Sequence, residues 1–179
     1  MKFRTMALGI AVGTAALGTS LFAAPAMAHI MFENGAVAAG TTTEFVLRVP
    51  HGCDGSPTVA VRVAVPKELE GVEALPKPGW KLSVVTDGLH QVSADANTAH
   101  SDGGEPKVKE LVWSNGRLED AFRDTFVFRA SVNKTATGRI FVPIVQQCEI
   151  GIERWIEIPA AGGSSDDLKY PAPSVGVEP

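Results

Sequence analysis

Strict alternation of apolar and other side chains is the feature that most constrains the fold of this chain. In the segment TVAVRVAVP (58–66), valines at every second position share one face, and alanine and arginine occupy the other. The segments DTFVFRASV (124–132) and GRIFVPIVQQC (138–148) are rich in β-branched and aromatic residues. A period of two places alternate side chains on opposite faces of a strand, and no segment keeps a helical period over several turns. The chain is therefore expected to fold as strands.

Short strands separated by turns continue to residue 159. The other expected strands are EFVLRVP (44–50), WKLSVV (80–85), KELVW (109–113) and IERWIEIP (152–159). Turn-forming residues fill the gaps at 50–57, 76–79, 86–88, 101–104, 114–116 and 135–138. This spacing predicts an all-β, immunoglobulin-like β-sandwich over residues 29–159. Residues 160–179 contain few apolar side chains, and we expect them to form a flexible C-terminal tail.

Residues 1–28 have the organisation of a secretory signal peptide. A basic start is followed by an apolar run over 6–24, and Ala26 and Ala28 form the small-residue pattern of a cleavage site. The alternative is a membrane anchor, because the run approaches the roughly 18 residues that a spanning helix needs. The run is rich in Ala and Gly, and no positively charged stop follows it. We therefore expect cleavage between Ala28 and His29 and export to the periplasm, without stable membrane insertion of the mature form.

The charge of the mature chain excludes two classes of partner. The whole chain carries a formal charge of −4, which becomes −6 when Lys2 and Arg4 are removed with the signal peptide. No basic patch is present in the sequence. Nucleic acid and anionic membrane surfaces are therefore not expected to bind.

Both cysteines, Cys53 and Cys148, lie in the part expected to be exported. Two cysteines of one small domain in an oxidising compartment most simply form a disulfide. Closing so long a loop removes unfolded-state entropy worth about 4.7 kcal/mol in the chain-entropy model. A thiolate metal ligand is the alternative, and we expect the disulfide.

His29 would become the first residue after cleavage. Its α-amino group, with a pKa of roughly 7.7–8, and its imidazole Nδ1 could then close a chelate ring on one metal ion. Nitrogen ligands in a planar arrangement favour Cu(II), which also heads the divalent affinity order. The alternative is chance, since 4 histidines in 179 residues give a histidine at any one position in about 1 of 45 cases.

Met31 lies two residues after His29 and shares its face on a strand. Its thioether is a possible Cu(I) ligand, but an apolar strand residue is the more common explanation. Met31 is the only methionine after residue 28. A methionine-rich Cu(I) site is therefore absent from the sequence, which favours Cu(II).

The remaining histidines divide into one candidate ligand and two solvated residues. His51 follows an expected strand and stands two residues before Cys53, so it is either a second imidazole ligand or a surface loop histidine. His90 and His100 lie in polar, turn-like surroundings and are expected to be solvated.

A disulfide from Cys148 would bring the segment QQCEIGIERWIEIP (146–159) beside the His51 loop. Glu149 and Glu153 are then available as oxygen ligands, or they are solvated strand residues. Trp155, considered alone, is a core residue.

The order of several motifs resembles the YcnI family of exported copper-binding domains. They are His29 directly after the signal, GTTTEFVLRVP (40–50), PKPGW (76–80) and the late strand with Trp155. The segments HGCDGSPT (51–58) and QQCEIGIERW (146–155) are similar to the Gram-negative branch of this family. The resemblance covers about residues 29–159.

The resemblance implies an immunoglobulin-like β-sandwich that binds Cu(II) through a single-histidine brace. The amine and imidazole of the first residue hold the metal, and a carboxylate and a nearby tryptophan complete the site. On this chain the brace falls on His29 and the tryptophan on Trp155. Many members have an acidic residue after the RVP motif, where this chain has His51 and Gly52. We expect His51 to replace that carboxylate, and the alternative oxygen donors are Glu153, Glu149 and Glu44.

The expected function is therefore copper homeostasis by binding, without catalysis. The protein would sequester Cu(II) or deliver it to a copper transporter, a chaperone or an apo-oxidase. One alternative is a copper-dependent oxidative enzyme with a histidine brace, which would need an open copper position and a broad aromatic platform. The other is a β-sandwich that makes protein contacts without a metal.

Overall fold

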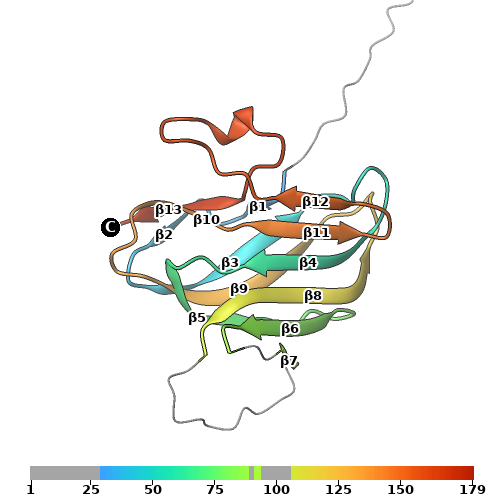
Figure 1. The fold of residues 1–179 in the computed structure, drawn as a ribbon, viewed down its shortest axis with the longest axis horizontal. Coiled ribbons are helices and arrows are strands. Elements are labelled where there is room, and N and C mark those ends of the chain that lie inside the picture. Colours follow the sequence, from blue (N-terminus) through green and yellow to red (C-terminus); the bar gives the residue numbers. More distant parts are fainter. Residues whose placement is uncertain (1–28, 89–90, 94–105) are drawn as a thin grey trace, which may run out of the picture.

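The computed structural model describes residues 29–88, 91–93 and 106–179, which form strands and one short 3-10 helix (Figure 1). The first strands are β1 (Met31–Phe32), β2 (Ala36–Ala38), β3 (Thr42–Val49), β4 (Thr58–Ala64), β5 (Leu69–Ala74), β6 (Lys81–Thr86) and β7 (Gln91–Ser93). They are followed by β8 (Val108–Leu118), β9 (Asp124–Val132), β10 (Gly138–Phe141), β11 (Ile144–Cys148), β12 (Ile152–Trp155), the 3-10 helix η1 (Ser165–Asp167) and β13 (Ser174–Glu178). The expected all-β architecture is confirmed.

The strands form two principal sheets and a small third one. One principal sheet has the order β1-β3-β9-β5, and the other has the order β12-β11-β4-β8-β6-β7 (Figure 1). The third sheet, β10-β13-β2, contains one parallel pair, between β13 and β2. β1 and β12 are edge strands of the two principal sheets.

Aromatic side chains join the two principal sheets in the core. Phe45 of β3 and Phe128 of β9, which lie opposite each other within one of these sheets, stack with ring centroids 5.0 Å apart. The contact between the sheets comes from another pair. Trp113 of β8 lies edge-on to Phe126 of β9 at 5.6 Å, and its indole N–H donates to the carbonyl of Leu75 at 3.0 Å. Such pairs combine a large buried apolar area with a satisfied polar group, which fixes how the sheets face each other.

The alternation in β4 holds at its centre and changes at its start. Val61 and Val63 are fully buried, as the alternation predicts. The pairing of β4 with β8 shifts register between Thr58 and Ala60, and Thr58 rather than Val59 is fully buried at this end. A register shift changes which side chains face inward. The hydroxyl group of Thr58 therefore lies in the interior at the start of β4.

Three local expectations were wrong. Residues 114–116 do not form a turn: they continue β8, with Asn115 at a φ of 57° and Gly116 packed so closely on Trp80 that a Cβ atom would lie 2.1 Å from its ring. The segment 138–148 is two strands, because β10 pairs with β13 whereas β11 pairs with β4 and β12. The strand expected over 152–159 ends at Trp155.

The C-terminal segment is not the flexible tail expected over residues 160–179. Its last part forms β13, which pairs antiparallel with β10 and parallel with β2. Ala172 and Val175 are buried in this segment. Its few apolar side chains suffice because they face inward and because backbone hydrogen bonds on both sides of β13 order the strand.

The disulfide between Cys53 and Cys148 is confirmed, with Cα atoms 6.0 Å apart. Within the described ranges, no helix has the length and apolar character to cross a bilayer. The expected signal peptide, the turn at 101–104, His90 and His100 lie outside these ranges.

Candidate metal centre

His29 lies two residues before the first residue of β1, an edge strand of its sheet. Ile30 and Phe32 alternate into the core, which anchors the start of the described chain. The His29 imidazole contacts the indole of Trp155, with centroids 5.7 Å apart and planes tilted by 60°. The first residue of the expected mature chain is thus brought to the tryptophan that the resemblance implies.

β12 presents Glu153 and Trp155 to the interior on the same face. Glu153 is 7% exposed and Trp155 is 0% exposed, whereas Ile152, on the opposite face of the strand, is 54% exposed. Trp155 also contacts the ring of Tyr170 at 5.4 Å. Alternation along a strand therefore places a carboxylate two residues from the indole that touches His29.

His51 is held with one ring nitrogen free. Its Nδ1 lies 2.5 Å from the carbonyl oxygen of Gly52. A carbonyl can only accept a hydrogen bond, so Nδ1 carries the proton and, in the neutral ring, Nε2 carries the lone pair. His51 Nε2 is buried and has no hydrogen-bond partner. An imidazole in this tautomer presents Nε2 as a metal ligand.

Glu153 has an unpartnered oxygen in the same region. Its Oε2 is buried without a hydrogen-bond partner. Burial raises the pKa of Glu153, and the nearby His51 opposes this shift. Asp54 and Asp120 also raise the pKa of Glu153, whereas Lys169 lowers it. The carboxylate therefore lies in an acidic, poorly solvated setting close to His51.

These two orphaned atoms fit a bound cation. His51 Nε2 and Glu153 Oε2 are both lone-pair donors, so neither can satisfy the other by a hydrogen bond while the imidazole is neutral and the carboxylate is ionised. A metal ion accepts lone pairs from both kinds of ligand. Among the described residues, no three His, Cys, Asp or Glu side chains are grouped so that they could hold a metal. A complete site would therefore need a donor of another kind, such as the α-amino group of His29.

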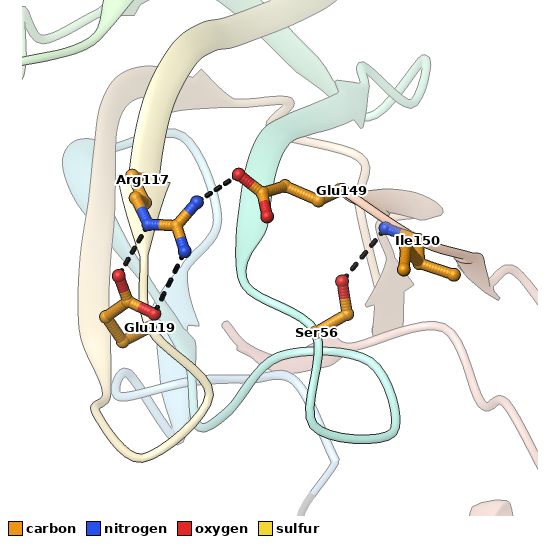
Figure 2. Close-up of polar contacts among 5 residues, drawn as sticks. All are labelled: Ser56, Arg117, Glu119, Glu149 and Ile150. Carbon is orange, nitrogen blue, oxygen red and sulfur yellow. Dashed lines mark hydrogen bonds and ion pairs between the residues drawn. The ribbon is translucent and has the colours of Figure 1, made fainter.

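The other oxygen candidates lie in different surroundings. Glu149 pairs with Arg117, which also binds Glu119 (Figure 2). Glu44 is exposed on β3, opposite Arg129 of β9. Neither carboxylate has the buried, unpartnered oxygen that Glu153 has.

Met31 is also engaged elsewhere. Its side chain is 41% exposed, and its sulfur accepts a hydrogen bond from Arg48 Nη2 at 2.6 Å. A cationic donor at the sulfur disfavours a metal cation at the same lone pairs.

The loop that carries His51 is fixed at several points. Cys53 and Ser56 exchange backbone hydrogen bonds around a turn, and the disulfide ties this turn to β11. Asp120 Oδ1 accepts from the Gly52 N–H at 3.0 Å, and a Cβ atom on Gly52 would lie 2.0 Å from the Ser56 carbonyl oxygen. Ser56 Oγ in turn accepts from the Ile150 N–H at 2.9 Å (Figure 2). Glycine is therefore required directly after His51.

A surface cleft of about 480 Å³ opens beside this loop. It is lined by residues 53–57, 149–153 and Tyr170. Glu153 belongs to this lining, whereas His29, His51 and Trp155 do not, so the cleft lies beside the candidate site.

Sequence reasoning missed Gln146, the polar residue beneath the site. Gln146 is fully buried on β11, between the inward-facing Ile144 and Cys148. Its amide connects Trp155 with the backbone of His51. The available signal was a polar side chain at an inward position of an otherwise apolar alternation.

The fold and these inward-facing His, Glu and Trp side chains define a β-sandwich with a candidate metal centre at one end. A family model described as "Domain of unknown function (DUF1775)" matches residues 29–177, and the chain belongs to this family. The resemblance to the YcnI family is thereby confirmed.

Known proteins that resemble this chain include the following two. The "Copper-binding protein CutI" of Bacillus subtilis (strain 168) is 34% identical over 83 residues, which are 46% of this chain. The chain spans only 39% of the length of that relative. A crystal structure of an uncharacterized protein from Nocardia farcinica, reported to reveal an immunoglobulin-like fold, has a TM-score of 0.63 and 21% identity. It covers 84% of this chain and 99% of its own, which confirms the expected immunoglobulin-like fold.

Proposed function

We propose that the mature chain begins at His29 and binds Cu(II) in the periplasm, for sequestration or delivery and without turnover. The observation that carries this proposal is the pair of orphaned lone-pair donors, His51 Nε2 and Glu153 Oε2, the second of which lies on the strand that also presents Trp155. Trp155 contacts His29. The copper-binding name of the Bacillus relative and the start of the family match at residue 29 support the same proposal.

In this proposal, signal cleavage converts the backbone nitrogen of His29 from an amide into an amine that can bind a metal. The amine and the His29 imidazole form the brace, and His51 Nε2 and Glu153 Oε2 complete the donor set. Because these three side chains are not grouped without the metal, binding requires the His29 side chain to move toward the other two. Gly52 holds the His51 proton at Nδ1. Bound copper would supply the positive partner that the buried Glu153 carboxylate lacks. In this role the copper ion is bound cargo and takes part in no reaction.

The recipient of the copper is also part of the proposal. A copper transporter, a chaperone or an apo-oxidase could accept the ion from a site at one end of a small domain. The cleft that Glu153 helps to line gives such a recipient a docking surface beside the proposed site.

Two measurements on the exported protein test this function. Mass spectrometry of the N terminus should find His29 as the first residue. Titration with Cu(II), followed by electron paramagnetic resonance (EPR), should show nitrogen-coordinated copper at one ion per chain. A matched protein with one extra Met before His29 should bind much more weakly, because its His29 nitrogen is an amide. Equal binding by both proteins would refute the brace.

A further inference from the structure

We propose that Gln146 is a positioning residue that sets the orientations of Trp155 and His51 together. This inference rests on the proposed function, because it assigns the buried residue that aligns the copper-binding groups. The hydrogen bonds of Gln146 go to the His51 carbonyl, Thr58 and Trp155, and not to a donor atom of the proposed ligands.

Gln146 makes three hydrogen bonds from one buried amide. Its Oε1 accepts from the Trp155 indole N–H at 3.1 Å. Its Nε2 donates to the His51 carbonyl at 2.7 Å and to Thr58 Oγ1 at 2.8 Å. Both amide protons and one acceptor position are therefore used, and the group is satisfied without water.

Chemistry alone determines which way the amide points. The indole N–H can only donate, so it must face the amide oxygen. The His51 carbonyl can only accept, so it must face the amide NH₂ group. Reversing the amide of Gln146 would break both bonds, and the two partners therefore select the same orientation.

The position of Gln146 on β11 lets one side chain connect Trp155 directly with the backbone of His51. On β11 it lies opposite Glu153 of β12 and opposite Val61 of β4. Its side chain thus reaches from the strand that carries Trp155 to the loop that carries His51. Since His29 packs on Trp155, both histidines of the proposed site depend on this amide for their placement.

A purely structural role does not account for this arrangement. Ile144, on the same face of β11, fills its inward position with an apolar side chain. A buried amide costs free energy unless all its hydrogen-bonding groups have partners in fixed positions. An apolar side chain at this position would avoid that cost, so the amide is explained best if it orients its partners. Partners of metal ligands have this effect, and their loss lowers metal affinity by about 10–100-fold.

The test compares Q146M with T58V. Q146M keeps the length of the side chain and removes all three hydrogen bonds. T58V is the matched control, because among the three hydrogen bonds it removes only the third and leaves the Trp155–Gln146–His51 link intact. It also removes the 3.8 Å contact of Thr58 Oγ1 with Cys148 Sγ, which does not involve Gln146. Wild type, Q146M and T58V are measured for Cu(II) affinity, for the EPR spectrum of the bound ion and, without copper, by NMR of the Trp155 indole and the His51 ring.

Q146M should shift the NMR signals of both Trp155 and His51, weaken Cu(II) binding by about tenfold or more and alter the EPR spectrum. T58V should leave the affinity within about twofold of wild type. A third variant, Q146E, retains the acceptor for Trp155 and loses the donation to His51. It should shift the His51 signals much more than those of Trp155, and it answers the same question if Q146M does not fold.

The inference is overturned if Q146M and T58V lower the affinity equally, or if Q146M leaves the His51 signals unchanged. The proposed function fails separately, if wild type itself shows no nitrogen-coordinated Cu(II). The NMR comparison requires no copper, so it decides the role of Gln146 in either case.

Discussion

Replacing Glu153 with glutamine should stabilise the metal-free protein and weaken copper binding. Glu153 is 7% exposed, and its Oε2 has no partner. An unsatisfied buried polar group costs about 1–3 kcal/mol, and more when it is charged. Glutamine has the same shape without the charge. We therefore expect E153Q to raise the free energy of unfolding by about 1 kcal/mol at pH 7.5, which corresponds to a rise in Tm of about 2–4 °C for a domain of this size.

The pH dependence of this gain follows from the direction of the pKa shift. Burial raises the folded-state pKa of Glu153 above its ordinary value of 4.5. The folded protein therefore binds this proton more tightly than the unfolded chain does. The stability linked to Glu153 is fully present below pH 4.5 and is lost as the pH rises through the folded-state pKa. The advantage of E153Q should accordingly grow over this range and be smallest in acid.

Urea denaturation of wild type and E153Q from pH 4 to pH 8 measures this difference. E44Q is the matched control, because Glu44 is an exposed carboxylate on β3, and its stability should stay within about 0.5 kcal/mol of wild type. With Cu(II) added, wild type should gain more stability than E153Q, whereas E44Q should behave as wild type. A loss of stability in metal-free E153Q at pH 7.5, or a gain independent of pH, would refute the reasoning.

Three further outcomes are expected. The double variant C53A/C148A should lose about 2–5 kcal/mol of unfolding free energy and bind Cu(II) more weakly, because the His51 loop is released from β11; urea denaturation and Cu(II) titration measure both effects. Gly52→Ala should cost about 1–3 kcal/mol, since its Cβ would lie 2.0 Å from a carbonyl oxygen. Gly35→Ala, with nothing within 4 Å, should stay near wild type in the same assay. Deletion of residues 174–179 should lower Tm sharply in a thermal melt, because Val175 is fully buried and β10 and β2 lose their partner.

Much of the fold was predictable because side-chain alternation is a local property. The segment 124–132 has the bounds of β9, and the buried Val61 and Val63 follow the pattern read in 58–66. The pairing partners were not predictable, since they depend on contacts between distant residues. The strand β13 is an example. Its composition predicts a flexible segment, but its pairing with β10 and β2 stabilises it as a strand.

The candidate site was predictable in its members but not in its support. His29, His51, Glu153 and Trp155 could be named from motifs, and the structure brings Trp155 to His29. The ligand roles of His29, His51 and Glu153 remain predictions. The tautomer of His51 depends on the direction in which the Gly52 carbonyl points. The position of Gln146 beneath the site depends on the register between β11 and β12. Local sequence patterns encode neither feature.

The parallel pairing of β13 with β2 has a consequence for how the domain is completed. Gly176 lies beside Ala36, about 140 positions earlier in the chain. Contacts between such distant segments form late, because a long loop must close before they gain anything. The small sheet can therefore be completed only after the chain has been synthesised through β13. A chain that is still emerging from the ribosome before β13 has been made therefore lacks the pairings of this strand with β10 and β2.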